Sequence, residues 1–144
     1  MRKIAEVSNI INKPVSTVYS FVSDPANFPF WTKIKSVELE NDTGETGATY
    51  FLTTKGLLAD TKIHIEITKK SAHEHFAFTD LGRKDGNEIG FIFEDLDGKT
   101  KITAYRGTDT GVIYSLLTLN LVLARDVINE LNEMLANLKI VFEA

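Results

Sequence analysis

The three histidines of this chain, His64, His73 and His75, are the residues whose type and spacing first suggest chemistry. Alternate residues of a β-strand share one face, so His73 and His75 would present two imidazoles side by side. If the hairpin that contains them turns at Lys69–Lys70, His64 opposes His75 and Glu66 adds a carboxylate, a set that could bind a transition metal. The same register pairs Ile63 with Phe76 on the inner face and leaves the histidines toward solvent. We therefore favour an ordinary outer surface and predict no metal.

Arg106 is the second candidate, because a hairpin register places it among apolar side chains. Asp97–Gly98 is a two-residue turn signature, and counting outward from it pairs Ile89 with Arg106. Phe91 and Phe93 then lie on the same face as Arg106. The same register pairs Phe93 with Ile102, Phe91 with Ala104, Glu94 with Lys101, and Ile92 with Thr103.

A guanidinium on an apolar face needs a partner, since an unpaired buried charge is unfavourable. Arg106 could bind an anionic or carbonyl group of a ligand at the mouth of a cavity. Alternatively, it pairs with Asp80, which has the same inward parity, or extends to water from the end of its strand. The sequence leaves these alternatives open.

Other catalytic motifs are missing from the sequence. There is no serine elbow, phosphate loop or dinucleotide fingerprint, and the glycines of GETGATY suit a hairpin turn. The absence of cysteine excludes disulfides, zinc–thiolate sites and thiol nucleophiles. We therefore assign no catalytic residue and expect no cofactor.

Composition indicates an ordinary globular protein. The 144 residues suit one domain, over 1–144, and the formal net charge is -4 without a long run of like charges. This charge argues against nucleic acid as a partner. The apolar run 111–124 is too short to span a bilayer, and the N-terminus lacks the features of a signal peptide. We expect a cytoplasmic protein, either a monomer or a homodimer, without stable membrane insertion.

Hydrophobic spacing defines the elements that must position these residues. A first strand over 3–11 leads into a helix that begins near Pro14, and Asp24–Pro25 caps a second short helix. Six strands follow between Ile34 and Thr108. The inward face of 48–52 is not decided by the sequence, because either Ala48, Tyr50 and Leu52 or Thr49 and Phe51 could point toward the core. Leucines at three- and four-residue spacing then predict one long C-terminal helix.

This order of elements, together with the segment IINKPVSTVYSFVSDPANFPFW at 10–31, resembles the START-like superfamily of polyketide cyclases and lipid-transfer proteins (SRPBCC). The resemblance covers nearly the whole chain and includes the D-P-x-x-x-x-x-W element that ends at Trp31. It implies an α+β helix-grip fold: a seven-stranded curved antiparallel sheet wrapped around the C-terminal helix, with two short helices between strands 1 and 2 and a cavity inside. It implies no particular reaction, because the superfamily has no shared catalytic motif.

Counting strand directions places the aromatic segment before Lys33 at the same end of the sheet as the loops 55–60 and 81–87. There it would form an apolar rim, either as a gate over a cavity or as a plug of core residues. Tyr105 is a further candidate polar contact. The candidate ligand-binding residues are Phe30, Trp31, Tyr50, Leu58, Phe76, Phe78, Phe91, Phe93, Arg106, Tyr114, Leu116, Asn120 and Leu123.

Three functions are compatible with these observations. The first is binding or carriage of a small hydrophobic molecule, such as a lipid, an isoprenoid or an aromatic, polyketide-like compound. The second is a cyclase, dehydratase or hydrolase acting on such a compound, which requires an inward acid or base. The third is a protein-interaction module of the same fold, which an exposed apolar patch would favour. We rank the carrier first and lean away from an enzyme.

Overall fold

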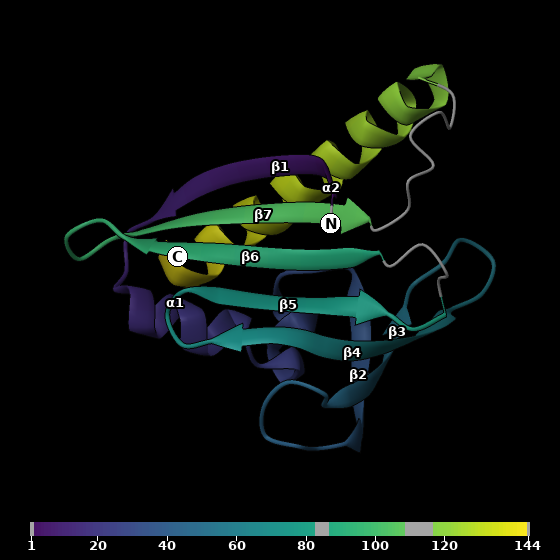
Figure 1. Cartoon of the computed structure of the whole chain (residues 1–144), viewed down its shortest axis with the longest axis horizontal. Coiled ribbons are helices and arrows are strands. Elements are labelled where there is room, and N and C mark those ends of the chain that lie inside the picture. Colours follow the sequence, from purple (N-terminus) through teal and green to yellow (C-terminus); the bar gives the residue numbers. More distant parts are fainter. Residues whose placement is uncertain (1, 83–86, 109–116, 144) are drawn as a thin grey trace.

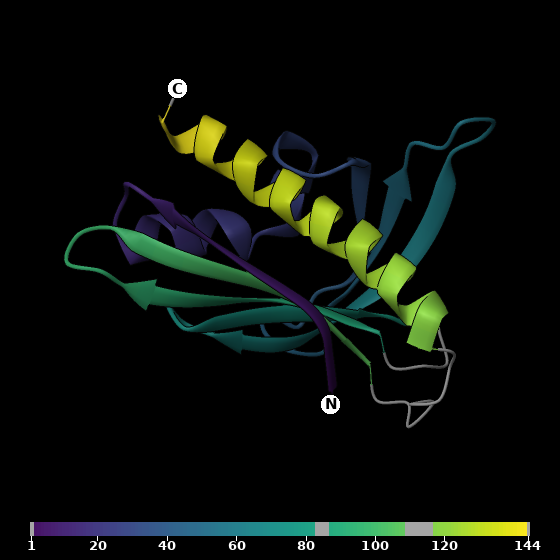
Figure 2. The same ribbon diagram turned by 90° about the horizontal axis from the view of Figure 1, so that it is seen from above.

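A computed structural model describes residues 2–82, 87–108 and 117–143, with the side chains of residues 2 and 117–124 excepted. Seven antiparallel strands form one sheet in the order β1-β7-β6-β5-β4-β3-β2. The helix α2, Leu117–Glu143, crosses one face of this curved sheet (Figures 1 and 2). The other elements are β1 Arg2–Ile11, α1 Val15–Val22, the 3-10 helix η1 Pro25–Phe30, β2 Ile34–Asn41, β3 Thr49–Thr54, β4 Thr61–Ser71, β5 His75–Asp80, β6 Glu88–Asp95 and β7 Thr100–Thr108. The predicted α+β helix-grip fold is confirmed.

The two short helices begin where the prolines and Asp24 predict. Pro14 has an extended conformation and precedes α1, whose residues Val18, Tyr19 and Val22 are buried. The Asp24 carboxylate accepts a hydrogen bond from the Ala26 amide at 3.1 Å, which caps the next turn. Proline within η1 limits it to a short 3-10 element.

The helix α2 packs against the inner face of the sheet through one stripe of side chains. Leu131, Leu135 and Leu138 are fully buried at three- and four-residue spacing. With 27 residues, the helix is about 40 Å long, which is enough to cross the sheet. It contacts β1, β7 and η1, so both ends of the chain contribute to one core.

The predicted register of the β6–β7 hairpin is confirmed. Phe93 pairs with Ile102, Phe91 with Ala104, and Ile89 with Arg106. The turn residues Asp97 and Gly98 have φ values of 58° and 93°, as a two-residue turn with two left-handed residues requires.

The predicted register of the β4–β5 hairpin is wrong. The turn lies at residues 72–74, so Ser71 pairs with His75, and Phe76 pairs with Lys70 in place of Ile63. A bulge between Ile67 and Lys69 offsets the two strands further. Lys69–Lys70 therefore continues a strand that we had expected to end there.

This register separates the three histidines. His73 lies in the turn with a φ of 63° and packs edge-to-face on Tyr19, with ring centroids 5.8 Å apart. His64 stacks on Phe51 on the outer face of the sheet, and His75 lies elsewhere on that face. Among the described residues, no group of three or more His, Asp and Glu side chains is placed to hold a metal ion.

Candidate functional site

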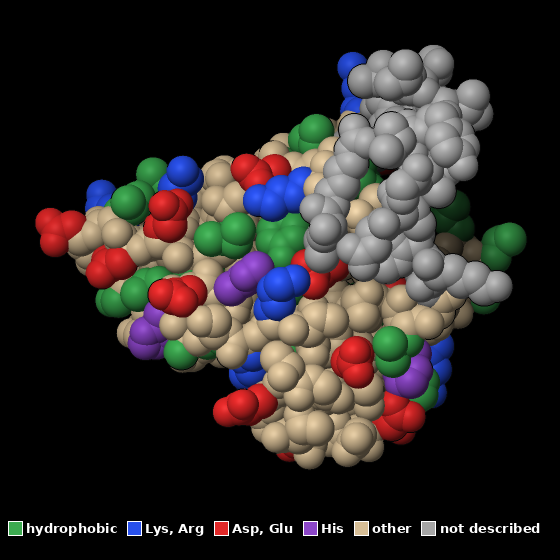
Figure 3. Space-filling model, in the orientation of Figure 1, with side chains coloured by type: hydrophobic (Ala, Val, Ile, Leu, Met, Phe, Trp, Pro, Cys, Tyr) green, Lys and Arg blue, Asp and Glu red, His purple; other side chains and the backbone are tan. Residues whose placement is uncertain are grey.

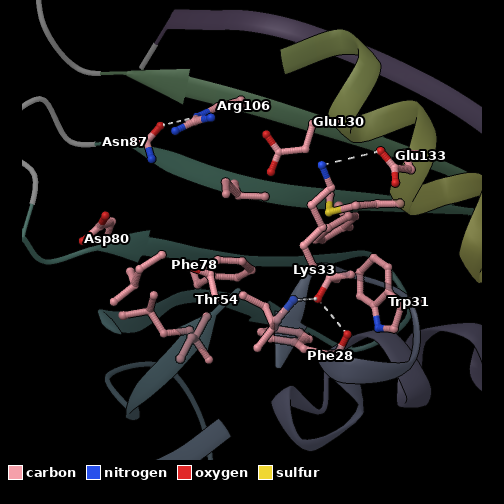
Figure 4. Close-up of a pocket in the computed structure, with 18 of the residues that line it drawn as sticks. Phe28, Trp31, Lys33, Thr54, Phe78, Asp80, Asn87, Arg106, Glu130 and Glu133 are labelled. Atoms are coloured by element: carbon pink, nitrogen blue, oxygen red, sulfur yellow. Dashed lines mark hydrogen bonds and ion pairs between the residues drawn. The ribbon is translucent and has the colours of Figure 1, made fainter. Parts of the chain in front are cut away.

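A cavity of about 180 Å³ lies between the inner face of the sheet and α2. In Figure 4, Phe28 and Trp31 lie on one side of the cavity, with the Lys33–Glu133 pair above them, and Asp80, Asn87 and Arg106 lie on the other side. Its lining residues come from η1, the segment after it, strands β2 to β7, the residue before β6, and α2: Phe28, Trp31, Thr32, Lys33, Ile34, Leu52, Thr54, Ile63, Ile65, Phe78, Asp80, Asn87, Ile89, Phe91, Arg106, Glu130, Glu133, Met134 and Asn137.

The apolar end is built by aromatic rings that pack on one another. Trp31 meets Phe91 edge-to-face at 5.3 Å between centroids, and Phe28 lies 5.4 Å from Phe78. Phe28 and Trp31 are each only 1% exposed. The short, proline-bounded η1 holds both rings against β5 and β6, so aromatic side chains form this end of the cavity.

The buried indole of Trp31 carries one hydrogen-bond donor, Nε1, that needs an acceptor. Its Nε1 has no hydrogen-bond partner in the part of the chain that the structure describes. A buried donor left without a partner typically costs about 1–3 kcal/mol. Since Trp31 lines the cavity, an acceptor oxygen of a bound molecule or of water would remove this cost.

The polar end of the cavity centres on Arg106 of β7. Arg106 Nε donates a hydrogen bond to Asn87 Oδ1 at 2.7 Å, and Asn87 is only 5% exposed. Asp80, the partner considered from the sequence, lies at the same end, where its carboxylate accepts from the Gly82 amide at 2.9 Å (Figure 4). Arg106 thus places a guanidinium, which can donate charge-assisted hydrogen bonds, at this end of the cavity.

A second polar group faces the cavity from α2 and the start of β2. Lys33 Nζ lies 3.8 Å from a Glu133 carboxylate oxygen, and both side chains are more than half exposed. Such an exposed pair contributes little to stability. Glu130 and Asn137 line the same side, so the cavity wall formed by α2 is acidic and amide-bearing where it approaches solvent.

The candidate ligand contacts lie in four places. Trp31, Phe78, Phe91 and Arg106 line the cavity. Phe76, Phe93 and Tyr50 belong to the core beside the cavity. The core also includes Leu52, so Tyr50 and Leu52 are the residues of β3 that point inward. Phe30 and Leu58 are 67% and 102% exposed and line no part of it. Tyr114 and Leu116 lie outside the described residues, as do the side chains of Asn120 and Leu123 in α2.

Sequence reasoning missed Asn87 and the polar residues of α2. Asn87 follows a loop, where strand alternation could not assign a direction. Glu130, Met134 and Asn137 recur at four and three residues along α2, so they share one helical face with the predicted apolar stripe. That spacing is the signal that could have identified them.

Tyr105 was expected among the polar contacts of the cavity, and this is wrong. It pairs with Gly90 on the outer face, the face turned away from α2. There its hydroxyl donates to a Glu88 carboxylate oxygen at 2.9 Å and accepts from His75 Nε2 at 2.7 Å. Lys69 and Thr68 also donate to Glu88, at 2.9 Å and 2.8 Å. We call these five residues the outer network, and Figure 3 shows histidine, basic and acidic side chains gathered near the centre of this face.

The outer network shifts the pKa of its members. Burial raises the pKa of Glu88, but hydrogen bonds from Lys69, Thr68 and Tyr105 more than offset this, so the net pKa lies below its ordinary value. Burial, followed by the charge of Lys69, lowers the pKa of His75. Burial and the hydrogen bond to Glu88 raise the pKa of Tyr105. At neutral pH the network therefore holds an ionised carboxylate, a neutral imidazole and a protonated phenol.

Gly90 provides the space in which the Tyr105 ring lies. A Cβ at residue 90 would overlap the ring and its hydroxyl. We expect Gly90→Ala to lower the free energy of unfolding by about 2 kcal/mol, because Tyr105 must swing away from Glu88 and His75. Urea denaturation would measure the loss. In a Tyr105→Ala background the same substitution should be nearly neutral, and an equal loss there would contradict this account.

The fold and the cavity define a helix-grip protein with an internal cavity. Residues 2–143 match the family described as "Polyketide cyclase / dehydrase and lipid transport", and the chain belongs to that family. No curated protein matches the sequence. None of the helices within the described residues is long and apolar enough to cross a membrane.

Solved structures share the fold at low sequence identity. The Thermus thermophilus protein TTHA0849 is 12% identical with a TM-score of 0.72, and the match covers 94% of this chain and 93% of that one. BexL, a di-domain ARO/CYC, is 14% identical with a TM-score of 0.76 over 98% of this chain and 47% of its own. StfQ, the di-domain ARO/CYC of the steffimycin biosynthetic pathway, is 10% identical with a TM-score of 0.74 over 99% of this chain and 51% of its own. This chain thus spans about half the length of each di-domain protein.

Proposed function

We propose that the protein binds, and thereby carries, a small hydrophobic molecule that ends in an anionic or carbonyl group. The observation that carries this proposal is the polarity of the cavity: aromatic rings close one end, while Arg106 held by Asn87 stands at the other. A ligand that matches this distribution buries its apolar part against Phe28, Trp31 and Phe91. Its oxygens then meet the guanidinium.

The size of the cavity narrows the ligand class. A cavity of about 150 Å³ lined by apolar side chains accommodates benzene. At about 180 Å³, this cavity therefore holds one aromatic ring or a short branched chain. A larger molecule would have to extend through the polar end into solvent. Aromatic and short branched-chain carboxylic acids are the compounds that we would test first.

The chain contains a built-in reporter for this test. Trp31 is its only tryptophan, and the indole lines the cavity, so occupancy should change the intrinsic fluorescence. Titration with benzoic, cinnamic and 2-naphthoic acids, each beside its methyl ester, would rank the size and charge of the ligand. Binding of none of these six compounds would refute the proposal for this ligand class.

Arg106→Gln is expected to weaken binding of the carboxylates roughly tenfold or more, because a charge-assisted hydrogen bond is lost. The methyl esters should bind the variant nearly as well as the unchanged protein. Lys101→Gln is the matched control, since it removes a cation from the same strand but from the outer face, where Lys101 lies 3.8 Å from Glu94. An equal loss for acids and esters would show that Arg106 supports the cavity without binding the anion.

A second candidate function is cyclisation or dehydration of a short polyketide-like substrate. It is favoured by the carboxylates of Asp80, Glu130 and Glu133 in the lining, which could transfer protons, and by the likeness to two proteins named as ARO/CYC. Incubation with a triketide acid, followed by mass spectrometry for loss of one water, would test it. Conversion above the uncatalysed rate would show that the protein is an enzyme. Saturable binding without conversion would support the carrier function instead.

A further inference from the structure

The β3–β4 loop carries two leucines that nothing in the fold covers. Leu57 and Leu58 are 105% and 102% exposed, whereas the other exposed large hydrophobic residues within the described chain reach at most 67%. In Figure 2 this loop projects from the body of the protein at the end of the β3–β4 hairpin. Two adjacent, fully hydrated leucines at such a tip are unfavourable in water, so they indicate an apolar partner.

The loop has a specific conformation that displays these leucines. A Cβ at Gly56 would overlap the Ala59 carbonyl group, so the backbone turns back on itself there as only glycine permits. The Asp60 carboxylate accepts a hydrogen bond from Lys35 Nζ at 2.8 Å and another from the Gly56 backbone. These contacts fasten the base of the loop to β2, which leaves Leu57 and Leu58 at its tip.

The base of the loop is rich in lysine. Lys55 lies two residues before Leu57, and Lys33, Lys55 and Leu57 line one shallow depression. Lys35 and Lys62 lie on the strands just below, each beside a carboxylate, Asp60 at 2.8 Å and Glu38 at 3.5 Å. Residues 55–59 themselves include no acidic side chain. A pair of apolar side chains with cations behind it matches the layers of a membrane surface, where acyl chains lie beneath anionic headgroups.

Area argues for a bilayer over a folded protein as the partner. Two leucine side chains supply on the order of 300 Å² of apolar surface, while a stable protein interface needs about 1,000 Å² or more. A membrane imposes no such threshold, since each inserted side chain contributes by itself. We propose that the β3–β4 loop docks the protein reversibly on lipid bilayers, by inserting Leu57 and Leu58 beneath headgroups that Lys33 and Lys55 contact.

The docking loop adjoins the cavity. Thr54 at the end of β3, Ile63 in β4 and Lys33 line the cavity as well as flanking the loop. A docked protein would therefore hold the cavity wall formed by Lys33, Thr54 and Ile63 close to the lipid surface. The docking itself does not depend on the proposed function, but transfer of a ligand between cavity and bilayer rests on it.

Flotation with vesicles tests the proposal. The full chain should float with vesicles of phosphatidylcholine mixed with phosphatidylglycerol, and less so as salt is added. Leu57→Ser/Leu58→Ser should lower the partition coefficient roughly tenfold or more. Lys55→Gln should lower it by a smaller factor, roughly two- to fivefold, on the anionic vesicles alone.

The matched control is Leu39→Ser/Leu96→Ser, which removes two leucines that are 50% and 42% exposed at other places. It should float like the unchanged protein. The proposal is overturned if the unchanged protein stays with the unbound fraction, or if both double variants lose binding equally. It is also overturned if the loop variant abolishes a concentration-dependent dimer, because the partner is then a second copy of this chain. Carboxylate titration of Trp31 fluorescence in the loop variant reports on the proposed function separately.

Discussion

Replacing Phe28 by alanine is expected to lower the free energy of unfolding by about 3–5 kcal/mol. Phe28 is 1% exposed and its ring contacts those of Trp31, Phe76 and Phe78. Its removal both exposes these rings to a new void and enlarges a cavity that already measures about 180 Å³. Urea denaturation, with Trp31 fluorescence as the signal, would give the change directly.

The same substitution should change which ligand the protein prefers. A naphthalene carboxylate that fits poorly beside Phe28 should bind the Phe28→Ala variant more tightly than benzoate does, and should restore part of the lost stability. Phe93→Ala is the control, because Phe93 is a buried core residue that does not line the cavity. It should cost a similar free energy without a change in preference. If both variants shift the preference alike, the cavity is not the binding site.

The second large effect is expected at the outer network. Glu88→Gln should lower the free energy of unfolding by about 3 kcal/mol, because it leaves the Lys69 ammonium and the Tyr105 hydroxyl without their charged acceptor. Glu94→Gln on the same strand is the control. Its partner Lys101 is 3.8 Å away and both side chains are well exposed, so the change should stay within about 0.5 kcal/mol.

The pKa shifts of this network also predict a pH dependence. The folded-state pKa of Glu88 lies below the ordinary 4.5, so its contribution is complete above that value and is lost as pH falls through the folded pKa. The folded-state pKa of His75 lies below the ordinary 6.5, so the unfolded chain takes up the proton first as pH falls. Both groups make stability rise with pH in the acid range.

Thermal melts between neutral and acidic pH would separate these two contributions. We expect Glu88→Gln to flatten the curve near the ordinary carboxylate pKa and His75→Gln to flatten it below the ordinary imidazole pKa. Melting profiles that keep the slope of the unchanged protein in both variants would show that neither group carries the acid sensitivity.

The hairpins show what local sequence can and cannot predict. Asp97–Gly98 specifies a two-residue turn, because both residues adopt a left-handed conformation. The position of this turn was enough to predict the whole β6–β7 register. The β4–β5 turn has no such signature: His73 adopts the left-handed conformation without being glycine, and a bulge follows Ile67. Packing of His73 on Tyr19 of α1 accompanies that conformation, and such a contact is not visible in the strand pattern.

The candidate site was predictable only where the strand register was. Alternation along well-registered strands brought Phe91 and Arg106 to one face. Asn87, Lys33 and the α2 residues required tertiary placement. The outer network had an available signal in Gly90 opposite Tyr105, since a glycine facing an aromatic residue across two strands leaves room for the ring to lie flat.

The position of β1 has a consequence for the synthesis of the protein. Its partner is β7, so Ile11 cannot find Thr100 until nearly the whole sheet has been translated. At about 5–20 residues per second, this interval lasts on the order of 5–20 s. During it, the unpaired edge of β1 with Ile4, Ile10 and Ile11 offers a template for other nascent chains. The aggregation risk at this edge of β1 is therefore greatest on the ribosome, before β7 pairs with it.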